Sequence, residues 1–113
     1  MKIVRNTQAR KFSNSKTCIA TEYPLNDNDI NAAVIALSGR YPDVGRVVNT
    51  ACKELVYIIK GAGLLVLENA KYNLEKGDIV IIEKDERYHW EGTMTILTVC
   101  NPAWYPEQHK EIE

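Results

Sequence analysis

The chain has 113 residues, of which 45% are hydrophobic and 26% are charged. This composition is typical of a folded globular protein and argues against intrinsic disorder. The chain has fourteen Lys and Arg residues and fifteen Asp and Glu residues, which gives a net charge of −1. Because no run of basic residues stands out, we expect no nucleic acid partner. The length predicts one domain over residues 1–113, within the usual range of about 50–200 residues.

Two features predict a cytoplasmic protein that has no membrane partner. The N-terminal residues lack the apolar core of a signal peptide, and the longest apolar runs are far too short to span a bilayer. The three cysteines, Cys18, Cys52 and Cys100, are odd in number and widely spaced, with no C-x-x-C pair. In a reducing compartment such cysteines usually serve as small buried apolar residues.

In chain order, short apolar or β-branched runs alternate with turn clusters rich in Gly, Pro, Asn and Asp, which predicts an all-β chain. The predicted strands are 16–23, 32–38, 54–60, 64–68, 71–74, 78–83, 87–91 and 93–99. The GAG sequence at 61–63 is predicted to be a hairpin turn between two of these strands. The C-terminal EQHKEIE is compatible with one short helical turn. We expect N-terminal strands within 1–31, a core barrel over about 32–103 and a tail over 104–113.

Two of the predicted strands are apolar on both faces. In ELVYIIK, at 54–60, one side carries Val56 and Ile58, and the other carries Leu55, Tyr57 and Ile59; DIVIIE, at 78–83, is similar. Strands of this kind need cover on both sides, from a second sheet, a terminal segment or a partner subunit. Because so small a barrel has little material to cover its outside, we expect a homodimer.

The second half of the chain contains ELVYIIKG followed by L-x-x-G-D-I-V-I-I. With these motifs, about residues 45–103 resemble a small single-domain cupin of the RmlC-like type. Glu54 and Gly61 match the end of the first cupin motif, and Gly77 opens the second. The resemblance implies a double-stranded β-helix, or jelly roll, whose two sheets close on a ligand cavity.

The chain departs from the cupin pattern at the usual metal ligands. The histidine positions of the first motif fall on Val48 and Thr50, or on Val47 and Asn49, depending on the spacer. In the second motif the histidine position is Tyr88. His89 lies one residue further, so strand alternation points it away from the cavity unless a bulge turns it inward.

A transition-metal site needs about three suitable protein ligands, and the chain has only two histidines. The second, His109, lies in the C-terminal tail. We therefore expect no metal and no other cofactor. The alternative is an atypical metal site built from Glu54, His89 and Cys52.

Strand alternation also predicts which side chains line the cavity. The candidate catalytic residues are Glu54 and Tyr88, and the candidate ligand-binding residues are Thr50, Cys52, Trp90, His89, Asn49 and Arg46. Burial would raise the pKa of a glutamate towards the range of a general acid or base. The alternative is that Glu54 pairs with Lys53, Arg46 or Lys60 at the barrel mouth. Tyr88 and Trp90 are equally compatible with a packing role, and Cys52 lacks a neighbouring base that would make it a nucleophile.

The tail contains Trp104 and Tyr105 between Pro102 and Pro106, which hold it extended. Large aromatic side chains are costly to leave in water, so we expect them to fold back onto the barrel of their own chain. The alternative is that they cross to a partner subunit.

Three functions are compatible with these residues. The first, which we favour, is a metal-free cupin that binds a small molecule as a sensor or accessory protein. The second is a metal-independent isomerase or epimerase that acts on a sugar or nucleotide-sugar. In such an enzyme Arg46, Arg40 or Arg87 would bind the phosphate groups. The third is a metal-dependent cupin enzyme with the atypical site.

Overall fold

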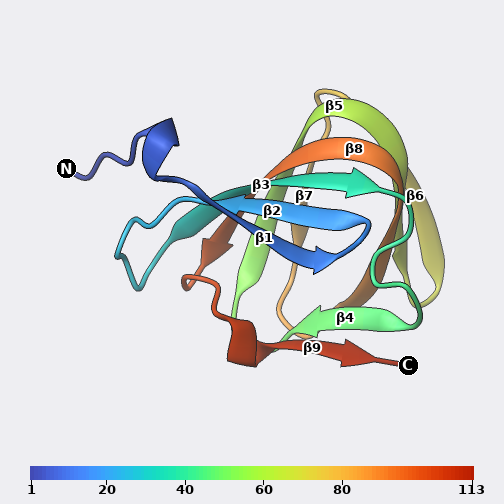
Figure 1. The fold of residues 1–113 in the computed structure, drawn as a ribbon. Helices are drawn as coiled ribbons and strands as arrows, with labels where there is room; N and C mark the ends of the chain where they lie inside the picture. The colour runs from blue at the N-terminus through green and yellow to red at the C-terminus, as the bar shows by residue number, and fades with distance from the viewer.

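The computed structural model describes all residues from 1 to 113, and almost all of its regular structure is β-strand (Figure 1). The strands are β1 (Arg10–Ser15), β2 (Cys18–Glu22), β3 (Asn31–Ser38), β4 (Arg46–Asn49), β5 (Lys53–Leu67), β6 (Ala70–Glu75), β7 (Ile79–Ile82), β8 (Arg87–Asn101) and β9 (His109–Ile112). Two 3₁₀ helices, η1 (Asn6–Gln8) and η2 (Pro106–Gln108), complete the order. Neither 3₁₀ helix has the length or the apolar character of a membrane-spanning helix.

The two longest strands, β5 and β8, connect the whole barrel. They pair antiparallel from Lys53 opposite Asn101 to Leu67 opposite Tyr88. The first half of β5 also pairs with β7, and its second half pairs with β6. In the same way β8 pairs with β4 near its start and with β3 along its second half. All nine strands are connected in one curled sheet, and the bend in β5 and β8 divides it into two facing halves, called here its two sheets. Both strands therefore belong to both, and the expected all-β, cupin-type barrel is confirmed.

The prediction of a hairpin turn at 61–63 is wrong. β5 runs without interruption through Gly61 and Gly63, and β8 runs through Gly92. Instead of reversing, both strands bend and stay paired, as the curled ribbons of β5 and β8 show in Figure 1. Gly61 and Gly92 adopt φ values of +86° and +111°, a region that suits glycine. The GAG sequence signals a bend in the sheet rather than its end.

The C-terminal segment contains the expected short helical turn and also an additional strand. A short turn is present as η2, but most of the remaining residues form β9, which pairs antiparallel with β4. The buried side chain of Gln108 holds this arrangement. Its Oε1 accepts hydrogen bonds from the backbone nitrogens of Ala51 (3.0 Å) and Cys52 (3.4 Å), and its Nε2 donates to Asn49 Oδ1 (3.1 Å).

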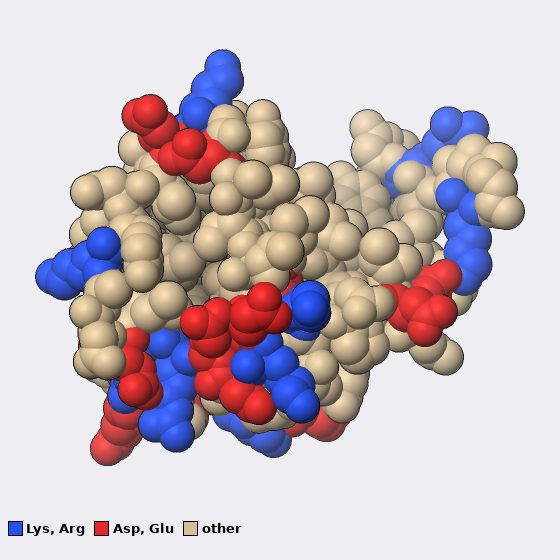
Figure 2. Space-filling model, turned by 180° about the vertical axis from the view of Figure 1, so that it is seen from behind, with Lys and Arg blue, Asp and Glu red and all other residues tan.

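The inward side chains of β5 are buried, whereas the outer side of one sheet is not covered within the chain. Val56 and Ile58 of β5 are fully buried, but Ile79 and Ile81 of β7 are 63% and 50% exposed. Neither a second sheet nor a terminal segment covers this outer face. Figure 2 shows a broad area without charged side chains on the side of the molecule turned away from the viewer of Figure 1.

The bend predicts a specific cost for adding a methyl group at Gly92. A Cβ there would lie 2.7 Å from the Cα of Gly63, so Gly92→Ala combines overpacking with a strained backbone. We expect a loss of about 3 kcal/mol in the free energy of unfolding, measured by urea denaturation. Gly77→Ala is the matched control, because Gly77 also has a positive φ of +94° but a Cβ there would meet nothing within 4 Å. An equal cost at both sites would contradict the close-approach argument.

Candidate functional site

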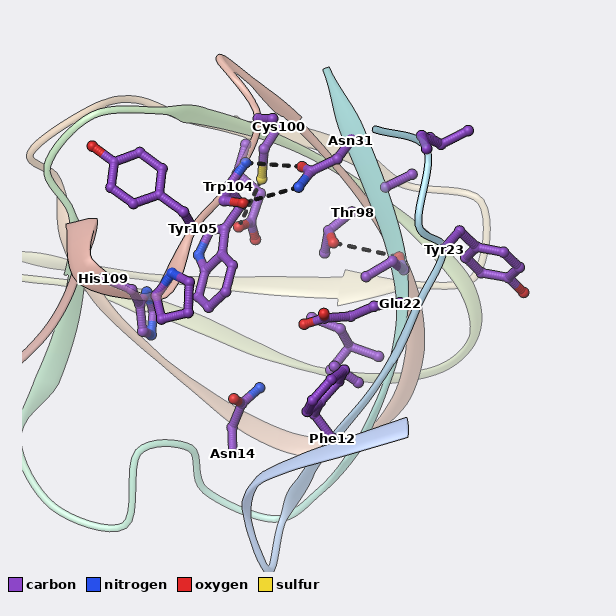
Figure 3. Close-up of a pocket in the computed structure, with 18 of the residues that line it drawn as sticks. Phe12, Asn14, Glu22, Tyr23, Asn31, Thr98, Cys100, Trp104, Tyr105 and His109 are labelled. Atoms are coloured by element: carbon purple, nitrogen blue, oxygen red, sulfur yellow. Dashed lines mark hydrogen bonds between the residues drawn. The ribbon is translucent and has the colours of Figure 1, made fainter. Parts of the chain in front are cut away.

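A cavity of about 750 Å³ lies inside the barrel (Figure 3). Its walls come from β1, β2, β3, β5 and β8, from the loop at 23–28 and from the segment at 102–109. The polar and charged lining side chains include Asn14, Glu22, Asn31, Glu54, Thr98 and His109, and the aromatic ones include Tyr41, Tyr88, Trp90 and Trp104. A mostly apolar cavity of this size with a few polar groups is typical of a small-molecule site.

Glu54 is the carboxyl group at the buried end of this cavity. It is only 6% exposed, because β5 directs it inward together with Val56 and Ile58. Asn49 Nδ2 (3.4 Å) and Cys100 Sγ (3.6 Å) both donate to Oε1, and Oε2 accepts no hydrogen bond from the protein. Burial raises the pKa of Glu54 to about 7, against the smaller lowering effect of the Cys100 and Asn49 hydrogen bonds. The group can therefore gain or lose a proton near neutral pH.

The alternative pairing of Glu54 at the barrel mouth is wrong. Lys53 pairs with Glu83 at 3.5 Å, and Arg46 pairs with Glu68 at 2.9 Å. The physical reason is that Glu54 points to the inside, where no Lys or Arg side chain reaches it.

Tyr88 and Trp90 enter the cavity from alternate positions on β8. Both are buried, and their rings meet edge to face with centroids 6.3 Å apart. Burial, with the nearby Glu54 as a smaller cause, raises the pKa of Tyr88 well above its ordinary value. The Tyr88 hydroxyl therefore stays protonated at neutral pH and is available as a hydrogen-bond donor.

His109 reaches the cavity from the C-terminal strand, although no sequence pattern indicated it. Pairing of β9 with β4 places His109 opposite Asn49, and its Nδ1 donates to Asn49 Oδ1 at 2.7 Å. The Nε2 then carries the lone pair and accepts from the Tyr41 hydroxyl at 3.1 Å. Burial lowers the pKa of His109 to about 4, so the ring is neutral at pH 7. Through Asn49, a chain of hydrogen bonds joins Tyr41 and His109 to Glu54.

The model of the AraC-like ligand binding domain matches residues 31–91, more than half of the chain. The chain belongs to this family. The match spans β3 to the start of β8, and so contains Tyr41, Glu54, Tyr88 and Trp90. The cupin resemblance of the sequence is confirmed, since solved structures of the same fold include an RmlC-like cupin.

Solved structures share the fold of this AraC-like domain at low sequence identity. A Streptomyces PAC13 variant with uridine superposes with a TM-score of 0.88 at 15% identity, over 100% of this chain and 91% of that one. The polyketide cyclase RemF from Streptomyces resistomycificus gives 0.76 at 15%, over 100% and 86%. An RmlC-like cupin from Shewanella frigidimarina gives 0.72 at 13%, over 88% of both chains. No curated protein matches the chain.

Of the eight residues predicted for the site, the structure brings three to the cavity wall: Glu54, Tyr88 and Trp90. Asn49 and Cys52 are buried but do not line the cavity. Asn49 instead lies behind the wall, where it holds Glu54 and His109. Whether these residues act on a ligand remains a prediction.

The three other predicted site residues, Thr50, His89 and Arg46, lie outside the cavity. Thr50 is exposed and donates to the Gln108 carbonyl at 2.8 Å, because β4 ends at Asn49 and alternation does not continue across the connection to β5. His89 points away from Tyr88 and Trp90 and pairs with Glu91 at 2.7 Å. The salt bridge of Arg46 keeps it on the outside.

The other arginines proposed to grip a phosphate also lie outside the cavity. Arg40 donates to the carbonyl oxygens of Pro42 (2.5 Å) and Gly45 (2.8 Å). Arg87, like Arg46, pairs with Glu68. Among the lining residues the only Lys or Arg is Arg10.

The residues of the proposed atypical metal site are not brought together. His89 lies outside the cavity that Glu54 lines, and Cys52 is not part of the wall. No three His, Cys, Asp or Glu side chains are placed so that they could hold a metal ion. The cavity offers proton transfer and hydrogen bonding rather than a set of metal ligands.

The raised pKa of Glu54 predicts a pH-dependent cost to stability. The folded protein holds this proton up to about pH 7, whereas the ordinary value is 4.5, so its contribution to stability is full below pH 4.5 and is lost as pH rises through 7. The stability of Glu54→Gln relative to wild type should therefore rise by about 3 kcal/mol between pH 4 and pH 8. Urea unfolding at both pH values measures this difference.

The effect of His109 on the pH dependence of stability has the opposite sign, since its lowered pKa makes stability rise with pH between about 4 and 6.5. Wild type and Glu54→Gln both contain His109, so its effect cancels in the difference between their stabilities. Glu75→Gln, at an exposed carboxyl on β6, is the control and should follow the wild type. Parallel pH curves for Glu54→Gln and wild type would contradict the raised pKa.

Proposed function

We propose that this AraC-like domain binds a small organic molecule in the barrel cavity and acts as a sensor or accessory protein. The observation that carries the proposal is the cavity itself, with its aromatic walls and the unpaired Oε2 of Glu54 at its buried end. An unsatisfied carboxylate oxygen in such a place is costly unless something binds it. A ligand with a hydrogen-bond donor would remove that cost.

The solved structures of the same fold support a ligand of nucleoside size. PAC13 is described with uridine and as a nucleoside dehydratase. The present cavity, at about 750 Å³, lies within the usual range of about 300–1,000 Å³ for small-molecule sites. The proposal does not extend to a phosphorylated ligand, because Arg40, Arg46 and Arg87 are all engaged outside the cavity.

The binding proposal is tested by a substitution that fills part of the cavity with a larger side chain. Ala33 of β3 lines it, whereas Ala36 of the same strand is exposed on the other face. We expect isothermal titration calorimetry to detect binding of at least one member of a panel of nucleosides, free sugars and small amines. Ala33→Trp should abolish that binding, and Ala36→Trp should retain it. Equal binding by both variants, or no binding to wild type across the panel, would overturn the proposal.

A second candidate function is metal-independent acid–base catalysis on an unphosphorylated sugar or nucleoside, as in an isomerase or epimerase. The observation that favours it is Glu54, whose pKa of about 7 suits a general acid or base, beside the protonated Tyr88. In an enzyme of this kind Glu54→Gln and Tyr88→Phe would bind substrate but lose turnover. A sensor would show no turnover in wild type either.

We also propose that two copies associate through the outer sheet face of β7, β5 and β8. Cross-strand pairing gathers six apolar side chains there: Ile79, Ile81, Leu55, Tyr57, Leu97 and Val99. A contiguous apolar patch of this kind marks an interaction surface, and the small barrel has no segment of its own to cover it.

The three cysteines are free, which supports a reducing, cytoplasmic location.

The dimer proposal predicts the effect of a single charge on this face. Ile81→Lys places an ammonium group within the patch, so we expect it to convert a dimer into a monomer in size-exclusion chromatography with light scattering. Val44→Lys is the control, because Val44 is 80% exposed and lies outside the patch. A wild-type chain that stays monomeric at every concentration would contradict the proposal.

A further inference from the structure

We infer that the cavity is selective for a cationic organic ligand, such as an amine, whose charge lies against Glu54 and among the rings of Tyr88, Trp90 and Tyr41. This inference rests on the proposed binding function and names the chemical class of the ligand. It is carried by the charges of the lining residues, by the free oxygen of Glu54 and by the placement of the aromatic rings.

The distribution of charge around the cavity favours a cation over an anion. The acidic lining residues are Glu22, Asp27 and Glu54, against Arg10 alone. Asp27 is paired with Lys2 at 3.0 Å. Glu22, on β2, lies opposite Arg10 on β1 without a salt bridge, and Figure 3 shows its carboxyl group pointing into the cavity. Glu54 and Glu22 are therefore carboxyl groups with no ion-pair partner within the chain.

Glu54 is the decisive group because its side chain is almost completely buried. Its Oε1 takes both hydrogen bonds, from Asn49 and Cys100, and its Oε2 takes none. Oε2 is not among the buried polar atoms that are closed off without a partner, so it can be reached from the cavity. A buried carboxylate is stabilised by an opposite charge at hydrogen-bond distance, and no Lys or Arg of this chain supplies one.

The aromatic rings near Glu54 provide the second half of a cation site. Tyr88 and Trp90 meet edge to face, and Tyr41 lines the cavity with them. The charge of Glu54 acts on both Tyr41 and Tyr88, so these groups lie near one another. The faces of such rings attract ammonium groups, with an interaction that strengthens when water is excluded. A neutral ligand would gain the apolar contact but not this electrostatic term.

The ionisation of Glu54 predicts how the binding of a cation should depend on pH. The titratable groups around it are Cys18, Cys52, Cys100, Tyr41 and Tyr88, with His109 beyond Asn49, and none of them is a cation between pH 6 and pH 8. A bound cation favours the ionised carboxylate and competes with the proton. Binding should therefore tighten as pH rises through about 7, the pKa of the free group.

The test uses three probes of similar size and different charge: benzylamine, benzyl alcohol and benzoate. Isothermal titration calorimetry at pH 6, 7 and 8 should show the tightest binding for benzylamine, with an affinity that rises about tenfold from pH 6 to pH 8. Glu54→Gln should weaken benzylamine binding by about tenfold or more and remove its pH dependence, with benzyl alcohol unaffected. Glu75→Gln, at an exposed carboxyl on β6, should match wild type.

Two results would overturn the inference. Equal or tighter binding of benzyl alcohol or benzoate, abolished by Ala33→Trp, would show that the cavity binds small molecules without selecting a cation, and would leave the proposed function standing. Failure of all three probes to bind wild type would also overturn it. The proposed function itself would fail only if the nucleosides, sugars and other amines of the wider panel also failed to bind.

Discussion

The antiparallel pairing of β5 with β8 is the constraint on which the rest of the structure depends. The two strands stay paired from one sheet to the other, with one shift of register between Ile58 and Lys60, and Gly61 and Gly92 allow both to bend together. Because each sheet contains part of both strands, side chains from opposite ends of the pair face one space. Glu54, at one end, and Trp90, towards the other, line the same cavity for this reason.

That cavity is unusual in where it places charge. Burial of a carboxyl group opposes its ionisation, and the barrel offers Glu54 only an amide and a thiol as donors, both on one oxygen. Arg46 and Lys53, which are near Glu54 in sequence, instead form salt bridges on the outside. Structural stability alone would favour an apolar side chain at this position, so a carboxyl group that is costly to the folded state and open to the cavity supports the proposed ligand site.

The C-terminal segment completes the site from a part of the chain that carries no cupin motif. Gln108 satisfies two backbone nitrogens of the connection between β4 and β5, and the next residue, His109, is thereby held against Asn49 and Tyr41. Of the two aromatic residues expected to fold back, Trp104 does so through Asn31 and its ring centroid lies 5.5 Å from that of His109, whereas Tyr105 stays 47% exposed. The wall opposite the sheets is thus built by residues that follow the last long strand.

The sequence by itself determined the all-β class, from short apolar runs between turn clusters, and indicated the cupin-type barrel through a motif resemblance. It also determined which side chains point inward within a strand, because alternation of period two is a local property. It therefore placed Glu54, Tyr88 and Trp90 in the cavity and His89 outside it. Only the tertiary structure decided the positions of residues that lie beyond the end of a strand. Thr50 lies outside the cavity because alternation stops at Asn49, and the GAG bend looks like a turn in sequence because glycine permits both. Tyr41 and His109 meet through the pairing of β4 with β9, a contact between residues 68 positions apart, which no local pattern encodes.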